Sequence, residues 1–97
     1  MAEARIRETE TGRVAEGSGW FVLNLREASW ERSAGYGVSC GLEPADARFP
    51  HFGVNVTILE PGEPKSLYHS EDTQEGFLVL AGECVAVIEG AERPLRR

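Results

Sequence analysis

The chain has 97 residues, of which 41% are hydrophobic and 27% are charged. This composition argues against wholesale disorder, and the length fits one domain with a modest core. The formal net charge of −6 argues against a nucleic-acid-binding protein, because contacts to phosphates need clustered lysines and arginines.

Features of the sequence also bear on its location. No apolar run approaches the roughly 20 residues that a membrane-spanning helix needs. Residues 1–16 are charged and lack the apolar stretch of a secretory signal. The two cysteines, Cys40 and Cys84, are too few for a disulfide framework, so we expect both to be reduced and buried. These features predict a cytoplasmic protein without a membrane partner.

The N-terminal half of the sequence changes from mixed charges to strand patterns. Residues 1–16 show little periodicity and predict a flexible N-terminal arm, or an edge strand, ahead of a β domain of residues 17–97. Residues 20–25 are an apolar run of strand-forming residues, and residues 36–42 alternate with a period of two. Both segments are therefore predicted strands, and residues 43–46 indicate a turn after them.

A further strand is predicted over residues 54–59, followed by a turn over residues 60–64. Pro61 and Gly62 fit the two central positions of a type II turn. Proline suits the first position, and glycine adopts the positive φ of the second at little cost.

The C-terminal part contains two apolar runs, residues 77–81 and 84–89, with Gly82 between them. Glycine between two such runs predicts a tight hairpin. Residues 89–92 indicate a second turn, and residues 93–95 would begin another strand. No segment shows a convincing helical period, so short strands separated by glycine- and proline-containing turns predict an all-β sandwich or barrel.

The chemistry-bearing segment is residues 61–83, PGEPKSLYHSEDTQEGFLVLAGE, which resembles the first conserved motif of the cupin superfamily. That motif has a glycine, a His-x-His pair, a glutamate and a second glycine. Gly62 matches the first glycine, while Glu75 and Gly82 match the last pair with six residues between them. The resemblance implies a cupin-like jelly roll, or double-stranded β-helix barrel. It also implies an interior divalent metal ion (zinc, manganese, iron or nickel) beside a pocket for a small organic ligand.

The sequence departs from the motif at its histidine pair. Counted from Gly62, the two histidine positions fall on Tyr68 and Ser70. A turn longer by one residue makes His69 and Glu71 the pair, because residues two apart on a strand face the same way. Otherwise the site is degenerate and holds no metal. On the first interpretation the expected metal ligands are, in order of preference, His69, Glu75, Glu71 and Gln74.

A cupin barrel also needs a second motif with a further histidine, and no such segment follows Gly90. Two explanations stay open: the domain is truncated at its C-terminus, or a partner chain completes the barrel. The second favours a homodimer, which would cover unpaired strand edges. The side chains expected to line the ligand pocket are Tyr68, Phe77 and His51.

The sequence is therefore compatible with two functions from different classes. One is a cupin-type metal-binding protein with a small-molecule pocket and no specified reaction, since cupins include isomerases, dioxygenases, decarboxylases and binding proteins. The other is a metal-free module that binds a small ligand or a partner without catalysis. Whether the chain is an enzyme is left open, and the presence of bound metal separates the two hypotheses.

Overall fold

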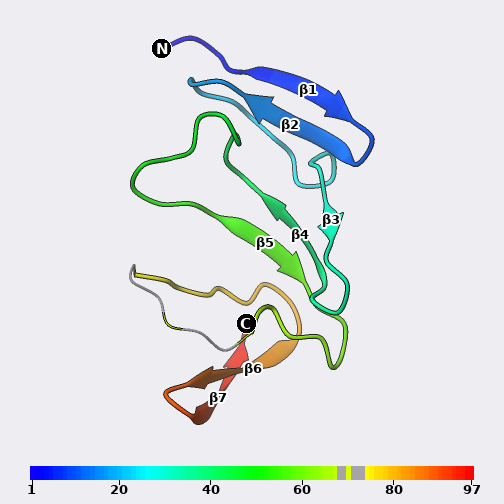
Figure 1. Ribbon diagram of the computed structural model, residues 1–97, viewed down its shortest axis with the longest axis vertical. Coiled ribbons are helices and arrows are strands. Elements are labelled where there is room, and N and C mark those ends of the chain that lie inside the picture. Colours follow the sequence, from blue (N-terminus) through cyan, green and yellow to red (C-terminus); the bar gives the residue numbers. More distant parts are fainter. Residues whose placement is uncertain (68–69, 71–73) are drawn as a thin grey trace. The chain divides into compact units, whose positions relative to one another are not determined.

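A computed structural model describes residues 1–67, 70 and 74–97, and these residues form strands, turns and irregular segments without a helix. The described strands lie in three antiparallel sheets, of two, three and two strands (Figure 1). The prediction of an all-β protein is confirmed, while no closed barrel is found among the described residues. No helix in this part of the chain could cross a membrane. The residues divide into two compact units, Met1–Ser66 and Leu67–Arg97.

The first sheet is a hairpin of β1 (Arg5–Thr9) and β2 (Gly12–Glu16). It occupies most of the segment 1–16, for which the sequence predicts a flexible arm or an edge strand. The charges that obscure any hydrophobic period are instead matched across the two strands: the Arg13 Nε donates to the Glu8 carboxylate at 2.6 Å. Such cross-strand pairing cannot be recognised from the sequence pattern of a single strand.

The second sheet has β4 (Val38–Gly41) at its centre, flanked by β3 (Glu31–Arg32) and β5 (Asn55–Ile58). The period-two segments that predict strands over residues 36–42 and 54–59 are thus confirmed in their central parts. Alternation is a local signal in the sequence, and within these two strands Cys40 is the buried residue while Gly41, Asn55 and Ile58 are exposed.

The predicted strand over residues 20–25 does not form. Trp20 makes only an isolated bridge to Glu3, and the chain then turns, with the Ala28 amide donating to the Asn24 carbonyl at 3.1 Å. An apolar run alone does not make a strand, because a strand also needs a neighbour that offers a ladder of hydrogen bonds.

The core of the Met1–Ser66 unit is built from small residues. Among the described residues, the buried hydrophobic ones are Ala4, Ala15, Ala28 and Cys40. Backbones approach closely where side chains are absent: a Cβ on Gly12 would collide with the Ala28 carbonyl. Close backbone packing takes the place of large interdigitating side chains.

The turn after β5 has the predicted geometry. Gly62 has a φ of 87°, and the Glu63 amide donates to the Glu60 carbonyl at 3.0 Å. These values fit a type II turn, with proline at the first central position and glycine at the second. The turn prediction from Pro61 and Gly62 is therefore confirmed.

The Leu67–Arg97 unit contains a hairpin of β6 (Glu83–Ile88) and β7 (Ala91–Arg96). Its two-residue turn has positive φ at both positions, 50° at Glu89 and 79° at Gly90, as in a type I′ turn. The predicted strand over residues 84–89 and the turn that follows it are confirmed.

The hairpin predicted around Gly82 is wrong, because residues 77–81 are not in a strand. Gly82 does adopt a positive φ of 73°, but it bends the chain into β6 without closing a ladder. The partner of β6 is β7 on its C-terminal side, since the Glu89-Gly90 turn has the right twist for a hairpin.

Candidate functional site

The predicted metal and pocket residues fall in different parts of the chain. Tyr68, His69 and Glu71 lie outside the described residues. Gln74 and Glu75 are both exposed, whereas the apolar run beside Glu75 predicts its burial. Of the expected pocket residues, His51 is an exposed residue of the Met1–Ser66 unit and Phe77 an exposed residue of the Leu67–Arg97 unit.

The described residues do not by themselves assemble a metal site. Among them, no group of three or more histidine, cysteine, aspartate or glutamate side chains lies close enough to hold one. A transition metal needs several converging donors of this kind. Both cysteines are free thiols, but only Cys40 is buried, so the expected burial of Cys84 is wrong.

A cleft of about 310 Å³ opens in the Met1–Ser66 unit instead. It is formed by β1 and β2, by the loop after β2 and by the segment that begins at the end of β4. Its apolar lining consists of Val14, Ala15, Phe21, Leu23, Leu42 and Ala45, and its charged lining of Arg7, Arg13, Glu16, Glu43 and Asp46. An apolar wall with a few polar groups is the usual make-up of a small-molecule site, at the small end of the usual range of about 300–1,000 Å³.

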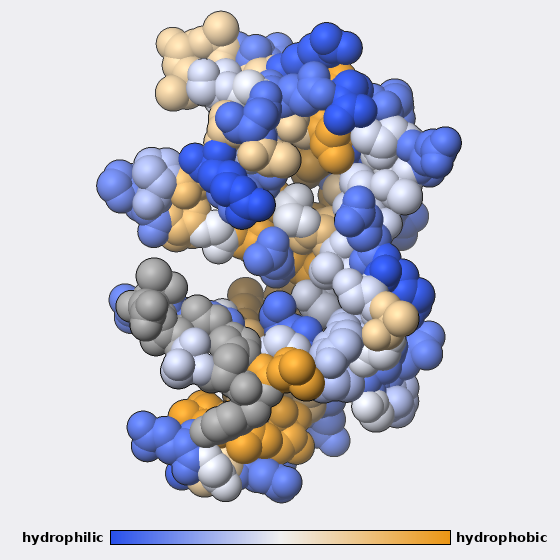
Figure 2. Space-filling view, in the orientation of Figure 1, coloured by the Kyte–Doolittle hydropathy of each residue, from blue (hydrophilic) through white to orange (hydrophobic). Residues whose placement is uncertain are grey.

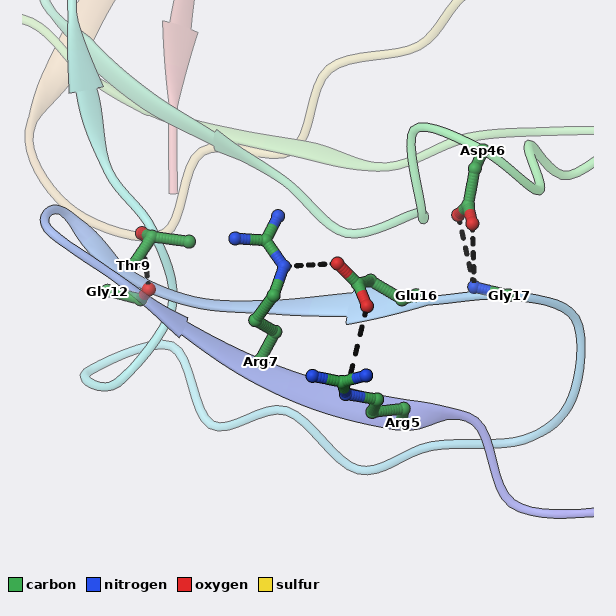
Figure 3. A network of polar contacts seen from close by, with 7 residues as sticks. All are labelled: Arg5, Arg7, Thr9, Gly12, Glu16, Gly17 and Asp46. Atoms are coloured by element: carbon green, nitrogen blue, oxygen red, sulfur yellow. Dashed lines mark hydrogen bonds and ion pairs between the residues drawn. The ribbon is translucent and has the colours of Figure 1, made fainter.

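Arg7 is the cation of this cleft that is least neutralised. Its Nε donates to the Glu16 carboxylate (Figure 3), which also lies 3.9 Å from the Nε of Arg5. The two terminal nitrogens of Arg7 have no hydrogen-bond partner in the described part of the chain. Glu16 therefore orients the guanidinium and leaves its outer edge free to donate.

Arg13, the second cation of the lining, is more fully matched. Its guanidinium donates to Glu8 at 2.6 Å and to Glu27 at 2.9 Å. The hydrogen bond and the charge of Glu8, with the charge of Glu27, raise the pKa of Arg13 above its usual value. Two carboxylates hold this side chain, so Arg13 has less capacity than Arg7 for an incoming anion.

The carboxylates of the cleft come from the segment after β4. Both oxygens of Asp46 accept from the Gly17 amide, at 3.0 and 3.2 Å (Figure 3). Glu43 accepts from the Phe49 amide at 2.7 Å and lies 3.6 Å from Arg48. Asp46 has no ion-pair partner within the described ranges, so its charge is balanced only by a neutral amide.

Sequence reasoning missed this cleft. Arg7 lies in the segment expected to be a flexible arm, and Asp46 lies in a predicted turn. No spacing rule connects two residues so far apart in the chain. The signal that could have found them is the mixture of arginines and glutamates on both sides of Gly12, which is compatible with a charged hairpin.

Comparison with known proteins finds no matching family model, no similar curated protein and no similar solved structure. Functional inference for this chain therefore depends on its own residues and their geometry.

Proposed function

We propose that this chain is a small cupin-type β protein that binds a small organic ligand, with a divalent metal site in the segment 62–82. The spacing of Gly62, Glu75 and Gly82 is the observation that carries this proposal. The positive φ values of Gly62 and Gly82, 87° and 73°, support it, because both glycines stand where the backbone favours glycine.

The metal ligands in this proposal are His69, Glu75, Glu71 and Gln74. Imidazole and carboxylate donors of this kind suit zinc, manganese, iron or nickel. Since the described residues supply no complete donor set, we assign no catalytic step to a metal.

Elemental analysis of the purified protein tests the metal site. We expect near-stoichiometric metal in the wild type and at least about a tenfold loss in His69→Ala and Glu75→Ala, because each variant removes a ligand. Glu92→Ala, which changes an exposed carboxylate of β7, is the matched control and should keep its metal. A folded wild-type protein without metal after exposure to these four ions contradicts the proposal.

A second candidate function is the metal-free binding of a small ligand, and the cleft of the Met1–Ser66 unit favours it. A ligand that binds only the folded protein raises its stability, by about 2.7 kcal/mol at a hundredfold excess over Kd. A library of small polar metabolites should therefore contain compounds that raise the thermal unfolding midpoint of metal-free protein.

A pair of neighbouring variants distinguishes the cleft from other surfaces. Leu23→Asn places an amide in the apolar lining and should abolish the stabilisation by those compounds. Val22→Asn changes a residue that is 73% exposed and does not line the cleft, so binding should persist. Equal effects of the two variants contradict a ligand site in the cleft.

A further inference from the structure

The charges of the cleft indicate what kind of ligand it takes. We propose that it binds a small zwitterion, an amino carboxylate with an apolar body, whose carboxylate is held by Arg7 and whose ammonium group is held by Asp46. This inference rests on the second candidate function, ligand binding in the cleft, and adds the chemical class of the ligand.

Arg7 provides the anion-binding end. Its Nε is occupied by Glu16 (Figure 3), so the guanidinium is held in one orientation, and its terminal nitrogens have no hydrogen-bond partner among the described groups. A guanidinium fork matches the two oxygens of a carboxylate. Arg13 cannot take this role as well, because Glu8 and Glu27 already engage it.

Asp46 provides the cation-binding end. Its carboxylate accepts from the Gly17 amide and has no ion-pair partner in the part of the chain that the structure describes. Gly17 directly follows Glu16 in the chain, so Asp46 and Arg7 both contact the end of β2. Glu43, another carboxylate of the lining, adds negative charge from the same segment as Asp46.

The apolar lining and the volume of the cleft determine the apolar body and the size of the ligand. Phe21, Leu23 and Leu42 offer a surface for a hydrocarbon or aromatic body. A space of about 310 Å³ suits a molecule of the size of one amino acid and is too small for a peptide of several residues.

Ligands with a single charge fit the cleft less well. A simple carboxylate would be attracted by Arg7 but repelled by the uncompensated charge of Asp46. A simple amine would be attracted by Asp46 but repelled by Arg7. Like charges in a partly covered site repel, whereas a zwitterion satisfies both ends at once.

Isothermal titration calorimetry with three related probes tests the inference. The probes are L-phenylalanine, 3-phenylpropionate, which lacks the ammonium group, and phenethylamine, which lacks the carboxylate. We expect L-phenylalanine to bind at least about tenfold more tightly than either analogue, since each analogue leaves one charged group of the cleft without its partner.

Variants then assign each end of the ligand. Arg7→Gln should weaken L-phenylalanine at least about tenfold while leaving phenethylamine unchanged or tighter, and Arg7→Lys, which keeps the charge without the fork, should lie between. Asp46→Asn, which still accepts from Gly17, should weaken L-phenylalanine but not 3-phenylpropionate. Arg5→Gln is the matched control, because Arg5 also faces Glu16 but does not line the cleft, and its binding should equal that of the wild type.

The outcomes separate this inference from the function on which it rests. Equal binding of L-phenylalanine and 3-phenylpropionate, or unchanged affinity in a folded Arg7→Gln, overturns the zwitterion. Absence of L-phenylalanine binding to the wild type also overturns it. In each of these three cases, any other compound whose binding is lost in Leu23→Asn leaves ligand binding in the cleft standing.

Discussion

Gly37 lies where the turn before β4 approaches the end of β5. Its φ is 80°, and a Cβ placed on it would lie 2.5 Å from the Ile58 carbonyl oxygen and 2.7 Å from Leu59 Cδ2. Gly35, two residues earlier, has almost the same φ of 81° but open space within 4 Å of its missing Cβ. Substitution of Gly35 therefore tests the positive φ alone, whereas substitution of Gly37 tests the positive φ together with close packing.

Replacing Gly37 with alanine should lower the free energy of unfolding by about 2–4 kcal/mol, because both the positive φ and the collision with a backbone carbonyl oppose a side chain. Gly35→Ala should cost only about 1 kcal/mol, from the backbone conformation alone. Urea unfolding of both variants measures the difference. Equal losses would show that the Ile58 carbonyl moves away without cost.

The two cysteines differ in accessibility. Cys40 is 2% exposed, while Cys84 is exposed. Burial raises the pKa of the Cys40 thiol, because a buried thiolate loses its hydration, and a hydrogen bond from the Val56 backbone opposes this only in part. The thiol of Cys40 is therefore expected to be inert near neutral pH.

A thiol-specific reagent should modify the exposed Cys84 of the native protein quickly and the buried Cys40 at least about tenfold more slowly, since the thiolate is the nucleophile. Cys84→Ser should remove the fast phase and Cys40→Ala the slow one. Two equally fast phases in the native protein would contradict the buried position of Cys40.

The raised pKa of Cys40 also affects the stability of the protein at alkaline pH. The folded state favours the neutral thiol, so the contribution of Cys40 to the free energy of unfolding is complete below the ordinary thiol pKa of about 8.5 and declines as the pH rises above it. Cys40→Ala should lose this decline, whereas Cys84→Ala should retain it. Urea unfolding between neutral and alkaline pH measures both slopes, and identical slopes in the two variants would contradict the assignment.

At the scale of elements, the β6–β7 hairpin depends on a turn that its first residue does not favour. Glu89 has a φ of 50°, a left-handed conformation that is unfavourable for most side chains but accessible to asparagine. The Gly90 that follows is at the position where type I′ turns most often have glycine.

Glu89→Asn should therefore stabilise the hairpin by about 0.5–1 kcal/mol, whereas Glu89→Ala, which removes the charge without favouring a positive φ, should not. Amide hydrogen exchange in β6 and β7 measures the effect locally. Equal protection in the two variants would mean that the charge of Glu89, and not its backbone conformation, limits the turn.

The two outer edges of this hairpin differ. Ile88 and Ala91 close the turn as a hydrogen-bonded pair, and hydrogen-bonded and non-hydrogen-bonded pairs alternate from there along the hairpin. Pro94 and Val85 therefore form a non-hydrogen-bonded pair, and the ring nitrogen of Pro94 lies on the outer edge of β7. Proline there blocks the addition of another strand, as it does on edge strands generally. In the part of the chain that the structure describes, no strand pairs with the other edge of β6, and β6 has no proline, so this edge remains able to pair.

At the scale of the whole molecule, little apolar surface is covered by the described chain. Val85, Val87 and Ile88 of β6 are 58%, 49% and 59% exposed, and Figure 2 shows apolar side chains gathered where β6 and β7 lie. An isolated two-stranded hairpin is marginally stable in water. A second copy of the chain that pairs with the β6 edge would place its own side chains beside Val85 and Val87, which share one face of the sheet, and would form the expected homodimer.

Association of this kind makes stability depend on protein concentration, so the thermal midpoint should rise with concentration and the elution volume should fall. Val87→Lys should weaken the association, because a buried ammonium group is costly. Glu92→Lys, on the blocked strand β7, should leave it unchanged. A monomer with a midpoint independent of concentration would rule out the homodimer.

The strands β4, β5 and β6 and the turns at Pro61-Gly62 and Glu89-Gly90 were determined by the sequence alone. Their signals are local, because alternation and turn chemistry act over a few neighbouring residues. The hairpin of residues 5–16 was missed, since its stabilising charges pair across strands. The metal ligands expected from the sequence, His69 and Glu75 foremost, stay a prediction.

Only the tertiary structure decided which strands pair and where a cleft opens. Residues 77–81 and β6 would have made a plausible hairpin by pattern, yet β6 pairs with β7. Arg7 and Asp46 line one cleft only because the chain after β4 returns to the end of β2. Such long-range contacts depend on the free energy of the whole arrangement, which no short stretch of residues encodes.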